Sequence, residues 1–151
     1  VRAVAPLTLT YHERLAMHEP AAFSHALRVY WEDTDAGGIV YYANYLKFFE
    51  RARTEWLRAA GFGQQAMAEA EGAMFVVTDA RIRYLSPARL DDTLQVTVQP
   101  IDIGRASMQI TQAAWRDTTV LCDGQIQIAC VDRGTFRPRR IPTDIIARLT
   151  E

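Results

Sequence analysis

The sequence is poor in the residues that hold many small metal-bound or disulfide-bonded folds together. Only two of its 151 residues are cysteine, Cys122 and Cys130, and both fall in one stretch with strand-like alternation. Neither belongs to a CxxC pair or has a histidine beside it, which argues against a zinc site and against a disulfide framework. We therefore expect two small, buried, apolar side chains.

Histidine is also scarce, and its positions matter more than its number. The three histidines are His12, His18 and His25, so the whole chain after His25 has none. The sequence also has no GxSxG segment, the strand-to-helix turn that presents a serine nucleophile in many hydrolases. A reaction carried by a serine and a histidine therefore has no support in this sequence.

Long apolar runs and an excess of one charge are absent too. No run approaches the ~20 residues of a membrane span, and the N-terminal segment lacks the apolar core of a signal peptide, so we predict a cytoplasmic protein. The formal net charge of −1 argues against nucleic acid as a partner. Lys47 is the lone lysine, and the other basic residues are arginines, which can bind phosphate groups locally.

The length and composition are those of one globular domain. A chain of 151 residues leaves little room for a second domain, and 49% hydrophobic with 23% charged residues is typical of a protein with a real core. Residues 1–23 show no sustained period and contain Pro6 and Pro20, so we expect a flexible N-terminal arm before a single domain over 24–151. Our hypothesis is that Met17 is the natural start.

Two segments at the start of the predicted domain differ in the period of their apolar residues. Residues 24–33 alternate with the period of two expected of a strand, and residues 44–60 change to a helical period. Asn44 is a fair N-cap for this long helix, and Gly61 stands in the usual place at its end. The positions expected on its buried face recur at three- and four-residue steps: Leu46, Phe49, Ala52 or Arg53, Trp56 and Ala60.

The rest of the chain is mainly strand-like. A short helix over 63–72, closed by Gly72, precedes four strand candidates, and a basic loop with one helical turn ends the chain over 135–149. The four strand candidates cover 73–86, 92–104, 105–117 and 118–133. One strand, a long helix and then a run of strands predict an α+β fold with an antiparallel sheet against the helix.

The segment "EDTDAGGIVYYANY", which starts at Glu32, joins the first strand to the long helix. This block resembles the signature of hotdog-fold acyl-CoA thioesterases, the group of 4-hydroxybenzoyl-CoA thioesterase and the thioesterase of the Tol-Pal envelope system, and the likeness runs from about Arg28 to Ile141. The resemblance implies five or six antiparallel strands wrapped around one long central helix. It also implies homodimers or homotetramers and hydrolysis of acyl-CoA without a metal or other cofactor.

The residues of this block fit thioester hydrolysis. Asp35 has no histidine or serine to act with, so it is either the nucleophile or the general base for water, and the sequence does not choose between them. Backbone N–H groups near Tyr41 and Tyr42, at the helix start, are our candidates to stabilise the oxyanion, and the glycines let a substrate approach closely. The alternative is that Asp33 and Asp35 only cap a turn and the tyrosines only pack.

The resemblance assigns further roles. It makes Asp35 catalytic, with Tyr42 where Tol-Pal-associated members commonly have histidine, and leaves Asp33 as support for the turn. It implies these substrate-binding residues: Gly38, Ile39, Val40, Tyr41, Val77 and Thr78. It places CoA phosphate contacts at Arg105 and Ser107, and the basic loop adds Arg137, Arg139 and Arg140.

Two other functions stay open. A hotdog dehydratase or hydratase would need a histidine on the helix, and none follows His25. A non-catalytic acyl-binding or scaffold partner of the Tol-Pal system is the alternative from another class. We also expect that the protein could associate with envelope proteins or with proteins of fatty-acid and phospholipid synthesis.

Overall fold

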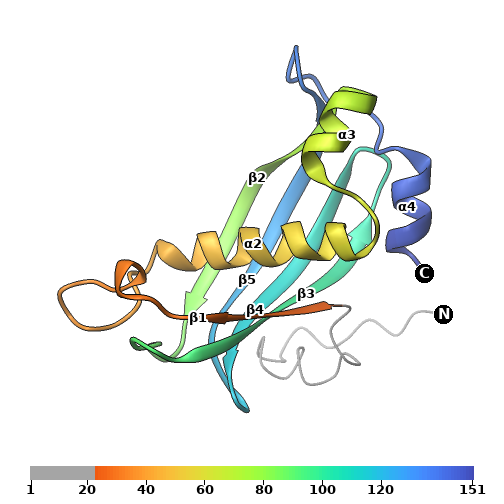
Figure 1. The fold of residues 1–151 in the computed structure, drawn as a ribbon. Coiled ribbons are helices and arrows are strands. Elements are labelled where there is room, and N and C mark those ends of the chain that lie inside the picture. Colours follow the sequence, from red (N-terminus) through yellow and green to blue (C-terminus); the bar gives the residue numbers. More distant parts are fainter. Residues whose placement is uncertain (1–22) are drawn as a thin grey trace.

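The fold is known from a computed structural model, which describes residues 23–151. Figure 1 shows one sheet of five strands around a long helix. In chain order the elements are β1 (Phe23–Arg28), a 3-10 turn η1 (Trp31–Asp33), α2 (Asn44–Ala59), α3 (Gln64–Glu71), β2 (Ala73–Tyr84), β3 (Thr93–Ile103), β4 (Ser107–Arg116), β5 (Thr119–Asp132) and α4 (Thr143–Leu149). The predicted N-terminal arm, including Met17, lies outside the described residues except for Phe23, which begins β1.

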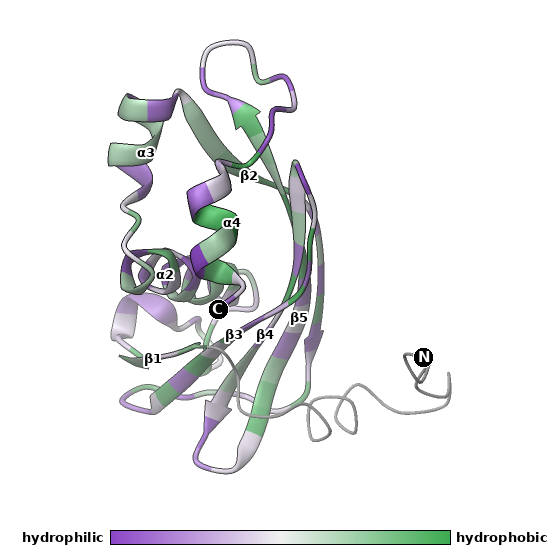
Figure 2. Cartoon of the chain, turned by 90° about the vertical axis from the view of Figure 1, so that its right-hand side faces the viewer, coloured by the Kyte–Doolittle hydropathy of each residue, from purple (hydrophilic) through white to green (hydrophobic). Residues whose placement is uncertain are grey.

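The strands form a single antiparallel sheet in the order β1-β3-β4-β5-β2. The predicted strands after residue 72, the short helix and the C-terminal helical turn are confirmed. The helices α2 and α3 lie on one side of the curved sheet (Figure 2). The predicted α+β architecture, a five-stranded antiparallel sheet around one central helix, is therefore confirmed, and both cysteines are free and buried in β5 as expected.

Helix α2 supplies the largest share of aromatic side chains to the core. Its buried positions are Asn44, Tyr45, Phe48, Phe49, Ala52, Trp56 and Leu57. Leu46, which the sequence placed on the buried face, is 43% exposed, because Tyr45 and the Phe48–Phe49 pair take the side facing the sheet and Leu46 is turned about 100° from Tyr45. Gly61, with φ of +96°, follows the helix as predicted.

One glycine in the sheet lets the helix approach closely. A Cβ at Gly124 of β5 would lie 3.1 Å from the Phe49 ring and 2.6 Å from Ile82 Cδ1. Such contacts are shorter than van der Waals distances, so a side chain at this position would push α2 away from the sheet.

Two predictions about the segment from the first strand to the start of α2 are wrong. The strand predicted over 24–33 ends at Arg28, and the 3-10 turn η1 follows it. Asn44 is the first residue of α2 rather than its N-cap, which is Ala43. Both differences have one cause: the Asp33 carboxylate bonds the backbone N–H of Tyr30 and the side chain of Asn44, and such local side-chain bonds compete with strand pairing and capping.

The edge strand β2 is largely exposed over its second half. Its residues from Val77 to Arg81 are all exposed, and their outer edge has no neighbouring strand in the described chain. No helix of the described residues is both long and apolar enough to cross a membrane.

Candidate active site

The loop between η1 and α2 holds Asp35 at an exposed position. Thr34 and Val40 form an antiparallel bridge, the N–H of Asp35 donates to the Ile39 carbonyl over 2.9 Å, and the N–H of Gly38 donates to the Asp35 carbonyl over 3.0 Å. Gly38 has a φ of +76°, which explains why a glycine stands at this point of so tight a turn. The backbone on both sides of Asp35 is therefore fixed by hydrogen bonds.

The two oxygens of the Asp35 carboxylate differ. Oδ1 accepts the N–H of Gly37 over 2.8 Å. Oδ2 accepts no hydrogen bond from the described residues, and the side chain is exposed to solvent. A carboxylate with one oxygen held by the backbone and the other unoccupied is oriented, yet still able to meet a water molecule or a carbonyl carbon.

Asp33 has the supporting role expected of it. Only 4% of its surface is exposed. Its Oδ2 accepts the N–H of Tyr30 and its Oδ1 accepts the side-chain amide of Asn44, each over 2.8 Å. The buried carboxylate thus ties the start of the loop to the first residue of α2.

The hydrogen bonds of the backbone at the helix start contradict one part of the prediction about the oxyanion donors. The N–H of Tyr41 donates to the Asp33 carbonyl over 2.9 Å, so it is not free to meet a substrate. The N–H of Tyr42 donates to no acceptor within residues 23–151. Of the two candidates for the oxyanion donor, Tyr41 is wrong because the loop turns back on η1, and Tyr42 stays a prediction.

Tyrosine rings surround the helix start. The ring of Tyr42 meets that of Tyr41 edge-on at 4.9 Å and that of Tyr84 at 6.0 Å, and the Tyr84 hydroxyl donates to the Tyr42 carbonyl over 2.9 Å. The neighbouring Tyr42 hydroxyl raises the pKa of Tyr41, and the negative charge of Asp35 adds to that rise. Tyr41 therefore stays neutral at physiological pH, with the negative charge of Asp35 close enough to act on it.

A pocket of about 310 Å³ lies between the helix start and the end of β2. Its lining residues are Ile39, Val40, Tyr42, Tyr45, Tyr84, Leu85, Ser86 and Pro87. The pocket brings together predicted site residues from the loop, namely Ile39, Val40 and Tyr42, while Tyr84 and Leu85 were not foreseen. Nothing local in the sequence marks Tyr84 as part of a site, because its place depends on the pairing of β2 with β5.

Val77 and Thr78, predicted to bind substrate, lie elsewhere on β2. Val77 pairs with Ile128 and Tyr84 pairs with Cys122, so the two β2 residues are seven positions apart, or roughly 23 Å at ~3.3 Å per residue. One chain therefore does not bring Val77 and Thr78 to the Asp35 loop.

Arg105 and Ser107 lie still further away. They stand where β3 turns into β4, whereas the loop meets the opposite end of the sheet, where Ile39 bridges to Arg89 just before β3 begins. Strand β3 has 11 residues, so these two ends are about 33 Å apart. The N–H of Ile141 donates to the Arg105 carbonyl over 2.7 Å, which brings the basic C-terminal segment beside Arg105.

Metal-binding side chains do not gather in the described residues. Within residues 23–151 no three residues of the types histidine, cysteine, aspartate and glutamate lie together in a way that could hold a metal ion.

Comparison with known proteins identifies relatives along almost the whole described chain. The family described as the thioesterase-like superfamily matches residues 29–149. The acyl-CoA thioesterase YbgC of Haemophilus influenzae is 44% identical over 125 residues, covering 83% of this chain and 92% of that protein. The acyl-CoA thioester hydrolase YbgC of Escherichia coli O157:H7 is 42% identical over 130 residues, covering 85% and 96%. A probable thioesterase from Bartonella henselae has a solved structure with a TM-score of 0.77 at 35% identity, covering 80% of this chain and 100% of that one.

Proposed function

This chain belongs to the thioesterase-like superfamily, and we propose that it is an acyl-CoA thioester hydrolase in which Asp35 carries the reaction. The observation that supports this most directly is the state of the Asp35 carboxylate, which is exposed: Oδ1 accepts the N–H of Gly37, and Oδ2 accepts no hydrogen bond from residues 23–151. It precedes the start of α2, where the Tyr42 N–H donates to no acceptor within residues 23–151.

The chemistry follows from these two groups. The carbonyl oxygen of the thioester lies at the Tyr42 N–H, where the partial positive charge of the helix start stabilises the oxyanion that forms. Asp35 either attacks the carbonyl carbon, which gives a mixed anhydride that water then hydrolyses, or it removes a proton from the attacking water. In both routes the CoA thiolate leaves and the free acid is released.

We propose that the complete site needs two copies of the chain. Arg105 and Asp35 lie at opposite ends of the sheet, which is too far apart for one CoA molecule to be held as predicted. Two sheets joined antiparallel along the exposed edge of β2 would run in opposite directions. The Arg105 end of one subunit would then lie on the same side as the Asp35 loop of the other, and β2 residues such as Val77 and Thr78 would lie between them.

The oligomer is tested by light scattering. We expect a mass of at least twice the 17.1 kDa of the chain at micromolar concentration. A monomer at that concentration would contradict the shared site.

The activity is tested with the pure protein and a panel of acyl-CoAs with short, long and aromatic acyl groups, with CoA release as the readout. We expect hydrolysis of at least one class well above the uncatalysed rate. No hydrolysis of any member by a folded oligomer would favour the non-catalytic acyl-binding partner instead. The cytoplasmic location predicted from the sequence is tested by fractionation of the host cells.

A further inference from the structure

We infer that a second pocket, between α2 and β2, receives the far end of the acyl group and that Arg53 makes it select acyl groups that end in a carboxylate. This inference rests on the proposed thioesterase function and names the substrate class of that site.

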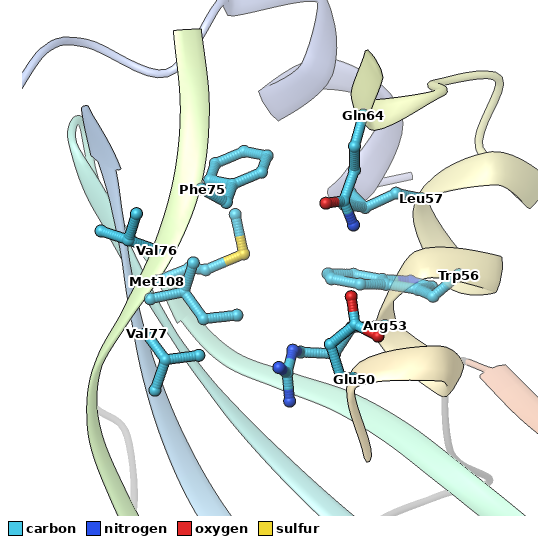
Figure 3. Close-up of a pocket in the computed structure, with 10 residues that line it drawn as sticks. Glu50, Arg53, Trp56, Leu57, Gln64, Phe75, Val76, Val77 and Met108 are labelled. Atoms are coloured by element: carbon cyan, nitrogen blue, oxygen red, sulfur yellow. The ribbon is translucent and has the colours of Figure 1, made fainter. Parts of the chain in front are cut away.

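The second pocket is small and has one polar end. Its volume is about 120 Å³, close to the roughly 150 Å³ of a cavity that holds one benzene ring, so it suits the end of an acyl group. Figure 3 shows Phe75 and Met108 reaching from the strands toward Trp56 and Leu57 of α2, with Glu50 and Arg53 at one end of the space. The apolar walls suit methylene groups, and the polar end suits a group that accepts hydrogen bonds.

Arg53 is held in place from the sheet. Its Nη1 donates to Oε1 of Gln112 over 2.9 Å, and Nε2 of Gln112 donates to the Phe49 carbonyl over 3.0 Å. Gln112 is fully buried, so its amide is a fixed support. The guanidinium is therefore oriented before any ligand arrives, which lowers the entropy that binding costs.

The charge of Arg53 forms no ion pair in the described part of the chain. Arg53 forms no ion pair with a carboxylate of residues 23–151, and Gln112 takes only one of its five N–H donors. Burial lowers the pKa of Arg53, and the charge of Glu50 raises it in part. A partly buried cation that forms no ion pair is stabilised by an anionic ligand, and the planar fork of a guanidinium matches a carboxylate.

One stripe of α2 runs from near the helix start to the second pocket, which Glu50, Arg53 and Leu57 line. Leu46, Glu50, Arg53 and Leu57 follow one another at four-, three- and four-residue steps, which places them on the same face of the helix. Leu46 is exposed, next to the helix start where the thioester is proposed to lie. From Asn44 to Arg53 the helix advances about 14 Å, and helical side chains lean toward the N-terminus, so Arg53 reaches back along this stripe.

Glu50 weakens the inferred preference for acyl groups that end in a carboxylate. Its carboxylate is exposed and its Oε1 accepts the Thr54 hydroxyl over 3.2 Å, so it lines the pocket without forming an ion pair with Arg53. Its negative charge opposes a ligand carboxylate. We therefore expect Glu50→Gln to strengthen the preference for acyl groups that end in a carboxylate.

The experiment compares acyl-CoAs of similar length that differ at the far end: adipoyl-CoA with heptanoyl-CoA, and suberoyl-CoA with nonanoyl-CoA. For the wild type, kcat/KM should be higher for the dicarboxylic member of at least one pair. Arg53→Gln should reduce the ratio of the two kcat/KM values by roughly ten- to hundredfold, as expected for one lost charged hydrogen bond. Arg53→Lys, which keeps the charge without the planar fork, should lose less.

Each outcome has a definite reading. If the wild type prefers the neutral member of both pairs, or if Arg53→Gln leaves the ratio unchanged, the inference about Arg53 is wrong while the thioesterase function stands. If the folded wild type hydrolyses neither member of either pair nor any acyl-CoA of the wider panel, the proposed function itself fails. Circular dichroism and light scattering confirm that each variant is folded and assembled.

Discussion

The side-chain amide of Asn44 donates a 2.8 Å hydrogen bond to Oδ1 of Asp33, across the loop that carries Asp35. Both partners are buried, and Oδ2 of the same carboxylate holds the N–H of Tyr30. The segment that precedes η1 and the start of α2 are thus joined at one carboxylate. The position of Asp35 relative to the helix start depends on this contact.

Removal of that contact should destabilise the protein. Asn44→Ala leaves a buried carboxylate oxygen without its donor, which costs about 1–3 kcal/mol in the free energy of unfolding. Urea unfolding measures the change. Ser24→Ala is the control, since it removes an exposed 2.9 Å hydrogen bond to Gln95 and should cost much less. Equal losses in the two variants would mean that the Asp33–Asn44 bond does not hold the loop.

Replacement of Gly38 should destabilise the protein because of the backbone conformation at this position, and not because of steric contacts of the new side chain. Its φ is +76°, while a Cβ there would meet no atom within 4 Å. Gly38→Ala should therefore cost about 1–2 kcal/mol of conformational strain, and Gly38→Asn should cost less, because asparagine tolerates the left-handed region. Unfolding curves of both variants test this order. Equal stabilities for alanine and asparagine would show that the loop relaxes to another conformation.

Much of this fold was predictable because its signals are local. The alternation in the strands, the helical period after Asn44 and the glycine at position 61 depend on neighbouring residues alone. The end of β1 and the role of Asn44 were not predictable, because both depend on which groups the Asp33 carboxylate bonds.

The residues of the candidate sites also fall into those that could be predicted from neighbouring residues and those that could not. The block around Asp35 is a continuous segment and could be recognised, whereas Tyr84 joins it only through the register of β2 with β5. Arg53 and Gln112 are 59 residues apart, and only the packing of α2 on the sheet brings them together. The predicted oxyanion donor at Tyr41 was wrong because the sequence does not show that the Asp33 carbonyl turns back toward it.

Arg105 should act in binding CoA and not in the chemical step. A remote phosphate contact is about equal in ground and transition states, so Arg105→Ala should raise KM for acyl-CoA more than it lowers kcat. A short thioester without the nucleotide should be affected little. Arg51→Ala, which changes another exposed arginine, is the control. Equal loss with both substrates would assign Arg105 a structural role.

The buried thiol of Cys122 should make stability depend on alkaline pH. Burial, with a smaller effect of the Asp123 charge, raises its pKa from 9.0 to about 12. Between these values the unfolded chain loses the proton and the native protein keeps it, so stability falls as pH rises from about 9 to about 12. At a pH of about 10.5 the loss from this group is about 2 kcal/mol.

The variant Cys122→Ala isolates this contribution, because the other titrating groups remain in both proteins. The difference in free energy of unfolding between wild type and variant should shrink from a pH of about 8 to a pH of about 10.5 by the amount above. A difference that stays constant over this range would mean that Cys122 titrates normally in the native protein.

The most direct test of the account is steady-state hydrolysis of one good acyl-CoA by Asp35→Asn. The substitution keeps the shape of the side chain and removes the charge that attacks or activates water, so kcat should fall by ~10²–10⁴-fold. Glu32→Gln, which changes an exposed carboxylate three residues away, should keep its activity, and Asp33→Asn should lose far less activity than Asp35→Asn, with some loss of stability. Circular dichroism confirms that each variant is folded. A folded Asp35→Asn protein with more than about a tenth of the wild-type kcat would contradict the account, because its loss would lie well below that range.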